Sequence, residues 1–91
     1  MTDMLRDNGQ RSRFELDFDG ETVFADYRRQ EDTLASLHVE APPALRGTGA
    51  AGELMRAIAE KARADGVTIK PYCGYAAAWL RRHREYQDLV A

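Results

Sequence analysis

Residues 46–52 read Arg46-Gly47-Thr48-Gly49-Ala50-Ala51-Gly52, a glycine-rich run that stands directly before a helical pattern. From Ala50 to Asp65, apolar residues recur with the spacing of one helical stripe, and charged residues cover the opposite side. Gly66 predicts the end of this helix. Glycines let backbone N–H groups approach an anion closely, and the helix dipole favours negative charge at a helix N-terminus. The run therefore predicts a phosphate-binding loop at the start of the main helix.

Two familiar nucleotide-binding loops fit this run poorly. The spacing Gly47-x-Gly49-x-x-Gly52 matches a dinucleotide-binding loop. That fold requires the loop directly after a strand of a parallel unit, and an acidic residue about 20 residues further on. Here the loop follows Pro42-Pro43, and the next predicted strand ends in Lys70-Pro71. A P-loop is excluded because no Gly-Lys-Ser/Thr follows.

Two alternating patterns upstream, over residues 13–18 and 22–27, are joined by Asp19-Gly20, which predicts a tight hairpin. The expected register places Leu16 opposite Val23, Phe14 opposite Ala25 and Arg13 opposite Asp26. A third strand is expected over residues 33–40 and ends at Pro42-Pro43. Strict alternation would place Ala35, Leu37 and Val39 on one of its faces and Leu34, Ser36, His38 and Glu40 on the other.

The remaining pattern predicts a short strand over residues 67–70 and a short helix from Gly74 to about Arg82. The order is β-β-β-α-β-α, an α/β (α+β) fold with a mostly antiparallel sheet. The long helix would connect the third and fourth strands as a crossover, which predicts that these two strands are parallel. Residues 1–11 are interpreted as a loose N-terminus and residues 12–91 as a single domain.

Composition excludes several classes of protein. The 91 residues are 44% hydrophobic and 31% charged, which is typical of one globular domain. Thirteen basic against fifteen acidic residues give a net charge of −2, which disfavours a general nucleic-acid binder. The single cysteine, Cys73, excludes an intrachain disulfide and a multi-cysteine zinc site, and it favours a cytoplasmic location. No apolar run is long enough for a membrane span, and no signal-peptide core is visible.

The pattern Arg46-x-x-Gly49-x-Ala51 resembles the signature that opens the main helix of GNAT-superfamily acetyltransferases. Three segments are similar to a family of very small, single-domain N-acetyltransferase-like proteins. They read His38-Val-Glu40-Ala-Pro42-Pro43-Ala-Leu45-Arg46-Gly47-Thr-Gly49, Pro71-Tyr72-Cys73-Gly74-Tyr75 and His83-Arg84-Glu85-Tyr86. The resemblance covers roughly residues 12–91. The chain departs from the family pattern at Val39, Gly74 and Arg84, where Thr, Pro and Pro are usual or frequent.

This resemblance implies a trimmed GNAT-like fold that binds acetyl-CoA or CoA and moves an acetyl group to an amine. The cofactor-binding residues would then be Arg46, Gly47, Thr48, Gly49, Ala50, Ala51 and Gly52, with Tyr75 beside them. Glycines that only let the helix pack on the sheet are the structural alternative. Besides His38 and Glu40, no second histidine–carboxylate cluster has the spacing of a metal site, so we expect no metal.

Three residues are candidates for the chemistry. Cys73 is expected at the N-terminus of the last helix, where the dipole favours a thiolate, so it could accept the acetyl group or contact the thioester. His38 and Glu40 lie two residues apart on one strand face; the imidazole could take a proton from the amine, and the carboxylate could orient it or act as base. The alternatives are a buried cysteine, a satisfied strand histidine and a loop hydrogen bond for the glutamate. Tyr72 and Tyr75 could donate to the leaving thiolate or serve in aromatic packing.

Two other functions stay open from the sequence: a non-catalytic module that binds or senses acyl-CoA, and a small interaction protein. The acceptor, an amine or a peptide, is not marked by any residue pattern. A chain of this size could act as a monomer or complete its site as a homodimer.

Overall fold

The predicted hairpin around Asp19-Gly20 is present in the computed structural model, which describes residues 5–91. Strand β2 (Arg13–Phe18) pairs antiparallel with β3 (Glu21–Gln30), and the three predicted cross-strand pairs are confirmed. Asp19 has φ 50° and Gly20 φ 80°. Two consecutive residues with positive φ are the mark of a type I′ turn, whose twist matches that of the strands.

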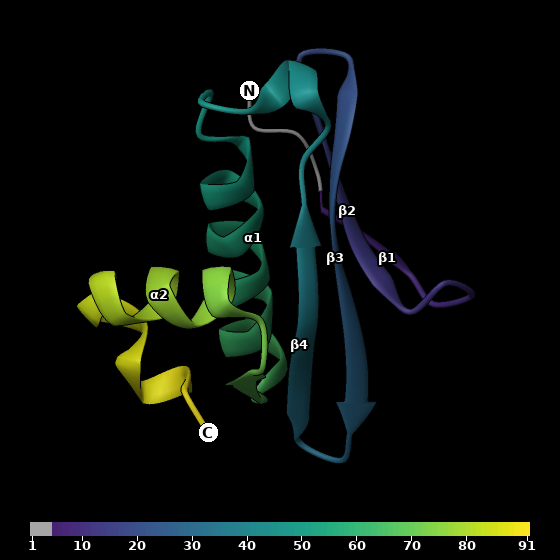
Figure 1. The fold of residues 1–91 in the computed structure, drawn as a ribbon. Helices are drawn as coiled ribbons and strands as arrows, with labels where there is room; N and C mark the ends of the chain where they lie inside the picture. Colours follow the sequence, from purple (N-terminus) through teal and green to yellow (C-terminus); the bar gives the residue numbers. More distant parts are fainter. Residues whose placement is uncertain (1–4) are drawn as a thin grey trace.

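The sheet has five strands in the order β1-β2-β3-β4-β5 (Figure 1). Strand β4 (Thr33–Glu40) pairs antiparallel with β3 and parallel with β5 (Thr68–Pro71). The predicted crossover is therefore confirmed, although β5 begins one residue later than residue 67 and ends at Pro71. The first strand, β1 (Arg6–Asn8), pairs with β2 and lies inside the stretch 1–11 that we interpreted as loose. That interpretation is corrected for residues 6–8, while residues 1–4 lie outside the described part of the chain.

Helix α1 (Ala50–Asp65) has the predicted bounds and lies along one face of the sheet (Figure 1). It ends at Gly66, which has φ 71° and donates its N–H to the carbonyls of Ala62 and Arg63. Helix α2 (Gly74–Arg82) follows β5 and contacts α1. Two 3₁₀ turns, η1 (Pro43–Leu45) and η2 (Arg84–Leu89), were not predicted. None of the helices in residues 5–91 is long and apolar enough to cross a membrane.

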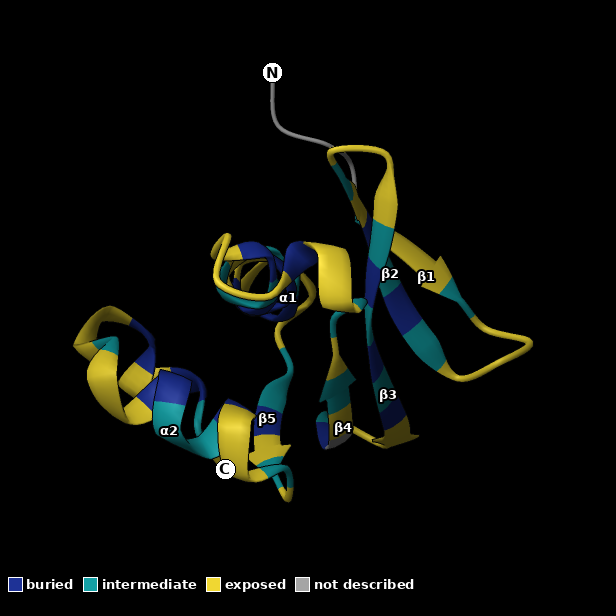
Figure 2. Ribbon diagram, turned by 45° about the horizontal axis from the view of Figure 1, so that its top comes forward, coloured by how far each residue is buried: buried dark blue, intermediate teal, exposed yellow. Residues whose placement is uncertain are grey.

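The hydrophobic core lies between α1 and the sheet, where the buried residues of Figure 2 face one another. Its largest fully buried side chains are Phe14, Val23, Leu54, Met55, Ile69 and Leu80. Trp79 of α2 and Tyr86 of η2 join the same core, so the C-terminal elements are packed onto α1.

Strand β4 departs from strict alternation. Asp26 is opposite His38 while Tyr27 is opposite Ser36, so β4 carries one extra residue between these two pairs. Such a β-bulge reverses which face each residue occupies beyond it. The predicted faces are therefore wrong for residues 34–36: Leu34 belongs to the core beside α1 and Val39 packs against that core, whereas strict alternation would place these two residues on opposite faces. The side chain of Leu37 lies outside what the structure describes.

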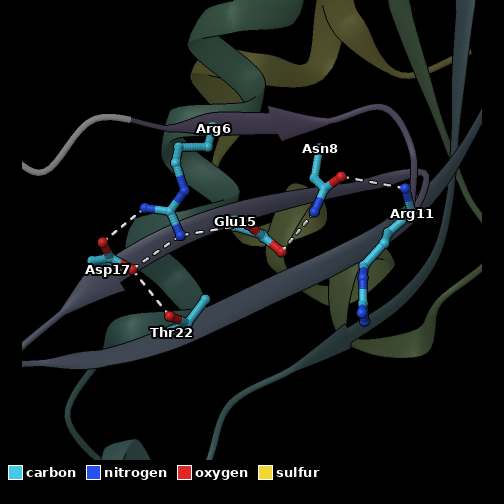
Figure 3. A network of polar contacts seen from close by, with 6 residues as sticks. All are labelled: Arg6, Asn8, Arg11, Glu15, Asp17 and Thr22. Atoms are coloured by element: carbon cyan, nitrogen blue, oxygen red, sulfur yellow. Dashed lines mark hydrogen bonds and ion pairs between the residues drawn. The ribbon is translucent and has the colours of Figure 1, made fainter.

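The sheet face away from α1 carries a network of charged and polar side chains, shown in Figure 3. Arg6 of β1 lies 2.7 Å from a carboxylate oxygen of Asp17 and 3.4 Å from one of Glu15. Thr22 donates to Asp17 at 3.0 Å. These contacts connect β1, β2 and β3 on a face that no helix of the described residues covers.

Candidate functional site

The glycine-rich loop connects η1 to α1 through two residues with left-handed backbone geometry. Gly47 has φ 80° and Gly49, the N-cap of α1, has φ 87°. L-residues with a side chain rarely adopt this region, so glycine is strongly favoured at both positions. Leu45 at the end of η1 is buried and attaches the start of the loop to the core.

Thr48 is engaged within the loop. Its hydroxyl donates to the carbonyl of Leu45 at 2.5 Å and accepts from the Ala50 amide at 3.3 Å. The first intrahelical bond runs from Glu53 N–H to the Gly49 carbonyl at 3.0 Å. The amides of Ala51 and Gly52 therefore have no intrahelical acceptor, and no other residue in the range 5–91 accepts from them. Two N–H donors and the positive end of the α1 dipole are thus available to an anion.

These donors lie at a hollow of about 270 Å³, which we call the loop hollow. It is lined by Ala41, Leu45, Arg46, Gly47, Gly49, Ala50, Ala51, Gly52 and Tyr75. The structure thus brings together all the residues predicted for cofactor binding except Thr48, whose hydroxyl forms hydrogen bonds within the loop instead. Arg46 supplies a positive charge at the hollow, whereas no acidic residue among residues 5–91 lines it.

Tyr75, in the first turn of α2, also lines the loop hollow. A Cβ built on Gly52 would lie 3.7 Å from the Tyr75 hydroxyl and 3.4 Å from Nε1 of Trp79. Burial raises the pKa of Tyr75, although Arg82 acts in the opposite direction. The phenol therefore keeps its proton at neutral pH and can donate a hydrogen bond.

Cys73 is the N-cap residue of α2 and lies beside the point where β4 and β5 separate. The last pair of the parallel ladder is Ser36 with Pro71. The Ser36 carbonyl then accepts the N–H groups of Tyr72, at 3.0 Å, and Cys73, at 3.1 Å. Cys73 is partly buried against the core, whereas Tyr72 is exposed.

His38 and Glu40 form a side-chain pair on the sheet face away from α1. The distance from His38 Nε2 to Glu40 Oε1 is 3.1 Å, and both side chains are about half exposed, at 54% and 56%. No hydrogen bond within residues 5–91 joins this pair to Cys73. The backbone of β4 connects the pair to both places instead. The strand runs from Ser36, beside Cys73, to Glu40, and the next residue, Ala41, lines the loop hollow.

A family model described as GCN5-related N-acetyl-transferase matches residues 13–89. The chain belongs to this family. Among solved structures it is similar to the NMR solution structure of a GCN5-like protein from Staphylococcus aureus, with a TM-score of 0.69 and 21% identity. That match covers 100% of this chain and 91% of the other, and it shows a shared fold. No curated protein matches the chain.

The trimmed GNAT-like fold expected from the resemblance is therefore confirmed for this family member, and an acetyltransferase-like function is supported. The sequence did not indicate Ala41 or Leu45 at the loop hollow, because the 3₁₀ turn that brings them there has no periodic pattern. Nor did it indicate Ser36, whose carbonyl holds the start of α2. In the described part of the chain, no group of three or more His, Cys, Asp or Glu side chains could hold a metal ion.

Proposed function

We propose that this protein binds acetyl-CoA at the loop hollow and transfers the acetyl group to an amine. The observation that carries the proposal is the pair of free amides, Ala51 and Gly52, at the start of a helix beside Arg46. Backbone N–H groups, a helix dipole and a guanidinium are the groups that bind a diphosphate.

The residues at the loop hollow fit the diphosphate of the cofactor. A hollow of about 270 Å³ suits a diphosphate rather than a whole CoA molecule. Beyond the Ser36–Pro71 pair, β5 has ended while β4 continues to Glu40, so the β4 edge has no strand partner there within residues 5–91. The extended part of acetyl-CoA between its diphosphate and its thioester can therefore lie along this edge, from the loop hollow toward Cys73. When bound, acetyl-CoA supplies an activated acetyl thioester.

The His38–Glu40 pair would take the proton that an amine must lose. A neutral imidazole can accept a proton from an amine, and the carboxylate 3.1 Å away can orient the ring for this transfer. The exposure of both side chains leaves this face open to an acceptor from solution. The acceptor class we propose is an amine or an amine-bearing peptide.

Cys73 would lie beside the acetyl group, because it is held at the point where β4 and β5 separate. Its sulfur could attack the thioester carbonyl, forming a new carbon–sulfur bond while the CoA thiol leaves with a proton. Direct attack by the amine needs no such step. Mass spectrometry after incubation with acetyl-CoA distinguishes the two: an acetyl adduct on Cys73 that Cys73→Ala removes indicates the covalent route.

The binding claim is tested by calorimetry with acetyl-CoA on the wild type, on Arg46→Gln and on Arg84→Gln. Arg84 is exposed on η2 and does not line the loop hollow, so it controls for loss of charge. We expect Arg46→Gln to weaken binding by about tenfold or more, because charge-assisted hydrogen bonds contribute about 1.5–3 kcal/mol, and Arg84→Gln to have no effect. Undetectable binding to the wild type at millimolar ligand would contradict the proposal and favour an interaction protein.

Turnover is tested separately with a panel of amines and peptides while free CoA thiol is monitored. Binding without acetylation of any acceptor would favour the alternative, a non-catalytic module that binds or senses acyl-CoA. We also propose a cytoplasmic location, since the one cysteine suits a reducing compartment. Sedimentation with and without acetyl-CoA would decide between a monomer and a homodimer.

A further inference from the structure

A second hollow, of about 620 Å³, lies at the opposite end of β3 from the loop hollow. Three arginines line it, Arg11 from the β1–β2 turn and Arg28 and Arg29 from the end of β3, and we call it the arginine hollow. We propose that it binds an acidic peptide segment, which lies in extended form along the free edge of β3.

The edge of β3 is open at this place because β2 is shorter. The pairing between β2 and β3 stops at Arg13 opposite Asp26, whereas β3 continues to Gln30 (Figure 1). The last bond across this edge runs from Tyr27 N–H to the Ser12 carbonyl at 2.9 Å. Backbone groups of alternate residues point to the same side of a strand, so the N–H and C=O of Arg29 point to this side as well. No described residue is paired with Arg29 on that side, so a peptide strand could pair with it.

The charges at the arginine hollow favour an acidic occupant. Arg29 lies 3.2 Å from Asp7, and Asp26 is held by Arg13 at 3.3 Å. Neither Arg11 nor Arg28 forms an ion pair with any carboxylate of residues 5–91. A local excess of positive charge thus stands in a chain whose net charge is −2.

The arginines also match the geometry of an added strand. Arg28 and Arg29 are neighbours in β3 and therefore point to opposite faces of the sheet. Side chains of an extended peptide alternate in the same way, so successive carboxylates would meet a guanidinium on each face. Nucleic acid is disfavoured because it has no peptide N–H and C=O groups to pair with the edge of β3.

Arg11 is carried on a turn with fixed geometry. Its amide donates to both the backbone and side-chain oxygens of Asn8, at 3.2 and 3.3 Å. Ser12, which also lines the hollow, has φ 52°, a conformation that non-glycine residues adopt at a cost of about 1–2 kcal/mol. The turn therefore holds the Arg11 backbone in place before any ligand arrives, which reduces the entropy lost on binding.

Arginines at a free strand edge can also serve only to prevent edge-to-edge aggregation. The two roles differ in what they predict for a ligand. A protective role predicts that removing the charges promotes aggregation and that no acidic peptide binds. A binding role predicts a saturable contact that depends on the same charges.

The test uses ¹⁵N-labelled full-length protein titrated with capped hexaglutamate, capped hexaglutamine and inorganic phosphate. We expect saturable shifts of the Ser12 and Arg29 amides with hexaglutamate alone. The double variant Arg11→Gln/Arg28→Gln should bind hexaglutamate about twofold to thirtyfold more weakly, since an exposed ion pair contributes about 0.2–1 kcal/mol. The control Arg84→Gln should bind as the wild type does.

Three results would overturn the proposal. The first is that hexaglutamate does not shift the Arg29 amide signal. The second is that inorganic phosphate produces the same shifts as hexaglutamate, which would indicate a site for free anions without strand pairing. The third is that the double variant binds hexaglutamate with unchanged affinity. If it aggregates at the same time, the arginines only protect the edge. None of these measurements involves acetyl-CoA, so they stand independently of the proposed acetyl transfer.

Discussion

The same substitution, glycine to alanine, should change stability in opposite directions at two positions three residues apart in the loop and helix α1. At Gly49 the backbone has φ 87°, and a Cβ would meet nothing within 4 Å. The cost of alanine there is therefore conformational rather than steric, about 1–2 kcal/mol for a left-handed L-residue. For a domain of this size, that corresponds to a fall in Tm of about 4–16 °C.

At Gly52 the backbone lies in the first turn of α1, and the new Cβ would make ordinary contacts with Trp79 Nε1 at 3.4 Å and the Tyr75 hydroxyl at 3.7 Å. Alanine fits this conformation and loses less backbone entropy on folding, so Gly52→Ala should gain about 0.4–1 kcal/mol. We expect its Tm to rise by up to about 8 °C. Because Gly52 lines the loop hollow, the added methyl group would also reduce the space in that hollow.

Thermal unfolding followed by circular dichroism measures both shifts, and calorimetry with acetyl-CoA measures binding to each variant. Gly52→Ala should be at least as stable as the wild type yet bind acetyl-CoA more weakly, by about tenfold if the methyl group costs about 1.4 kcal/mol of contact. Equal Tm shifts for the two variants would refute the backbone reasoning. A stabilised Gly52→Ala protein with unchanged affinity would refute the placement of the cofactor.

Three further predictions concern side chains away from the loop hollow. Tyr86→Phe removes the hydroxyl that donates to Glu60 at 2.5 Å and accepts from Arg56 at 3.3 Å, and it should lower the stability by about 1 kcal/mol in denaturant unfolding. The hydrogen bond to Glu60 raises the pKa of Tyr86 in the folded protein. The stability that this hydrogen bond contributes should therefore be complete below the usual tyrosine pKa of about 10, and it should fall as the pH rises through the higher pKa of the folded state. Spectrophotometric titration should show this tyrosine ionising at lower pH in Glu60→Gln, and an unchanged titration would contradict the assignment. The hydrogen bond from Arg6 lowers the pKa of Asp17, so its contribution is present above pH about 3.9 and is lost as pH falls through the lower folded-state value. Arg6→Gln should raise that pKa in an NMR titration, and a pKa equal to that of the wild type would show that the ion pair is absent in solution.

The sequence predicted those parts of the fold whose signal is local. The β2–β3 register followed from alternation on both sides of Asp19-Gly20, and the bounds of α1 from its apolar stripe and Gly66. The bulge in β4 had no such signal, because one extra residue leaves a plausible alternation on each side, and so residues 34–36 were placed on the wrong face.

Long-range contacts produced the other differences. Strand β1 is three residues long and has no alternating apolar pattern; it is held to β2 by backbone pairing and by the contacts of Arg6 with Glu15 and Asp17. For the candidate site, the glycine-rich run predicted most of the loop hollow because those residues are contiguous in the chain. The approach of Ser36 to Cys73 depends on a parallel ladder between segments more than thirty residues apart, which no local pattern encodes.

The parallel ladder between β4 and β5 also bears on how the chain folds. Strands β1 to β4 are joined by short turns, whereas pairing Leu34 with Ile69 requires the whole α1 crossover to be in place. We expect the meander to form early and β5 to dock late, so that truncating Ile69 accelerates unfolding more than it slows folding in stopped-flow measurements. A truncation of Ile69 that slows folding more than it accelerates unfolding would contradict this order. The N-terminus of α2 is held by that same ladder, so the region around Cys73 would form only at the final step of folding, and a nascent or partly unfolded chain would lack the site that we propose for the thioester.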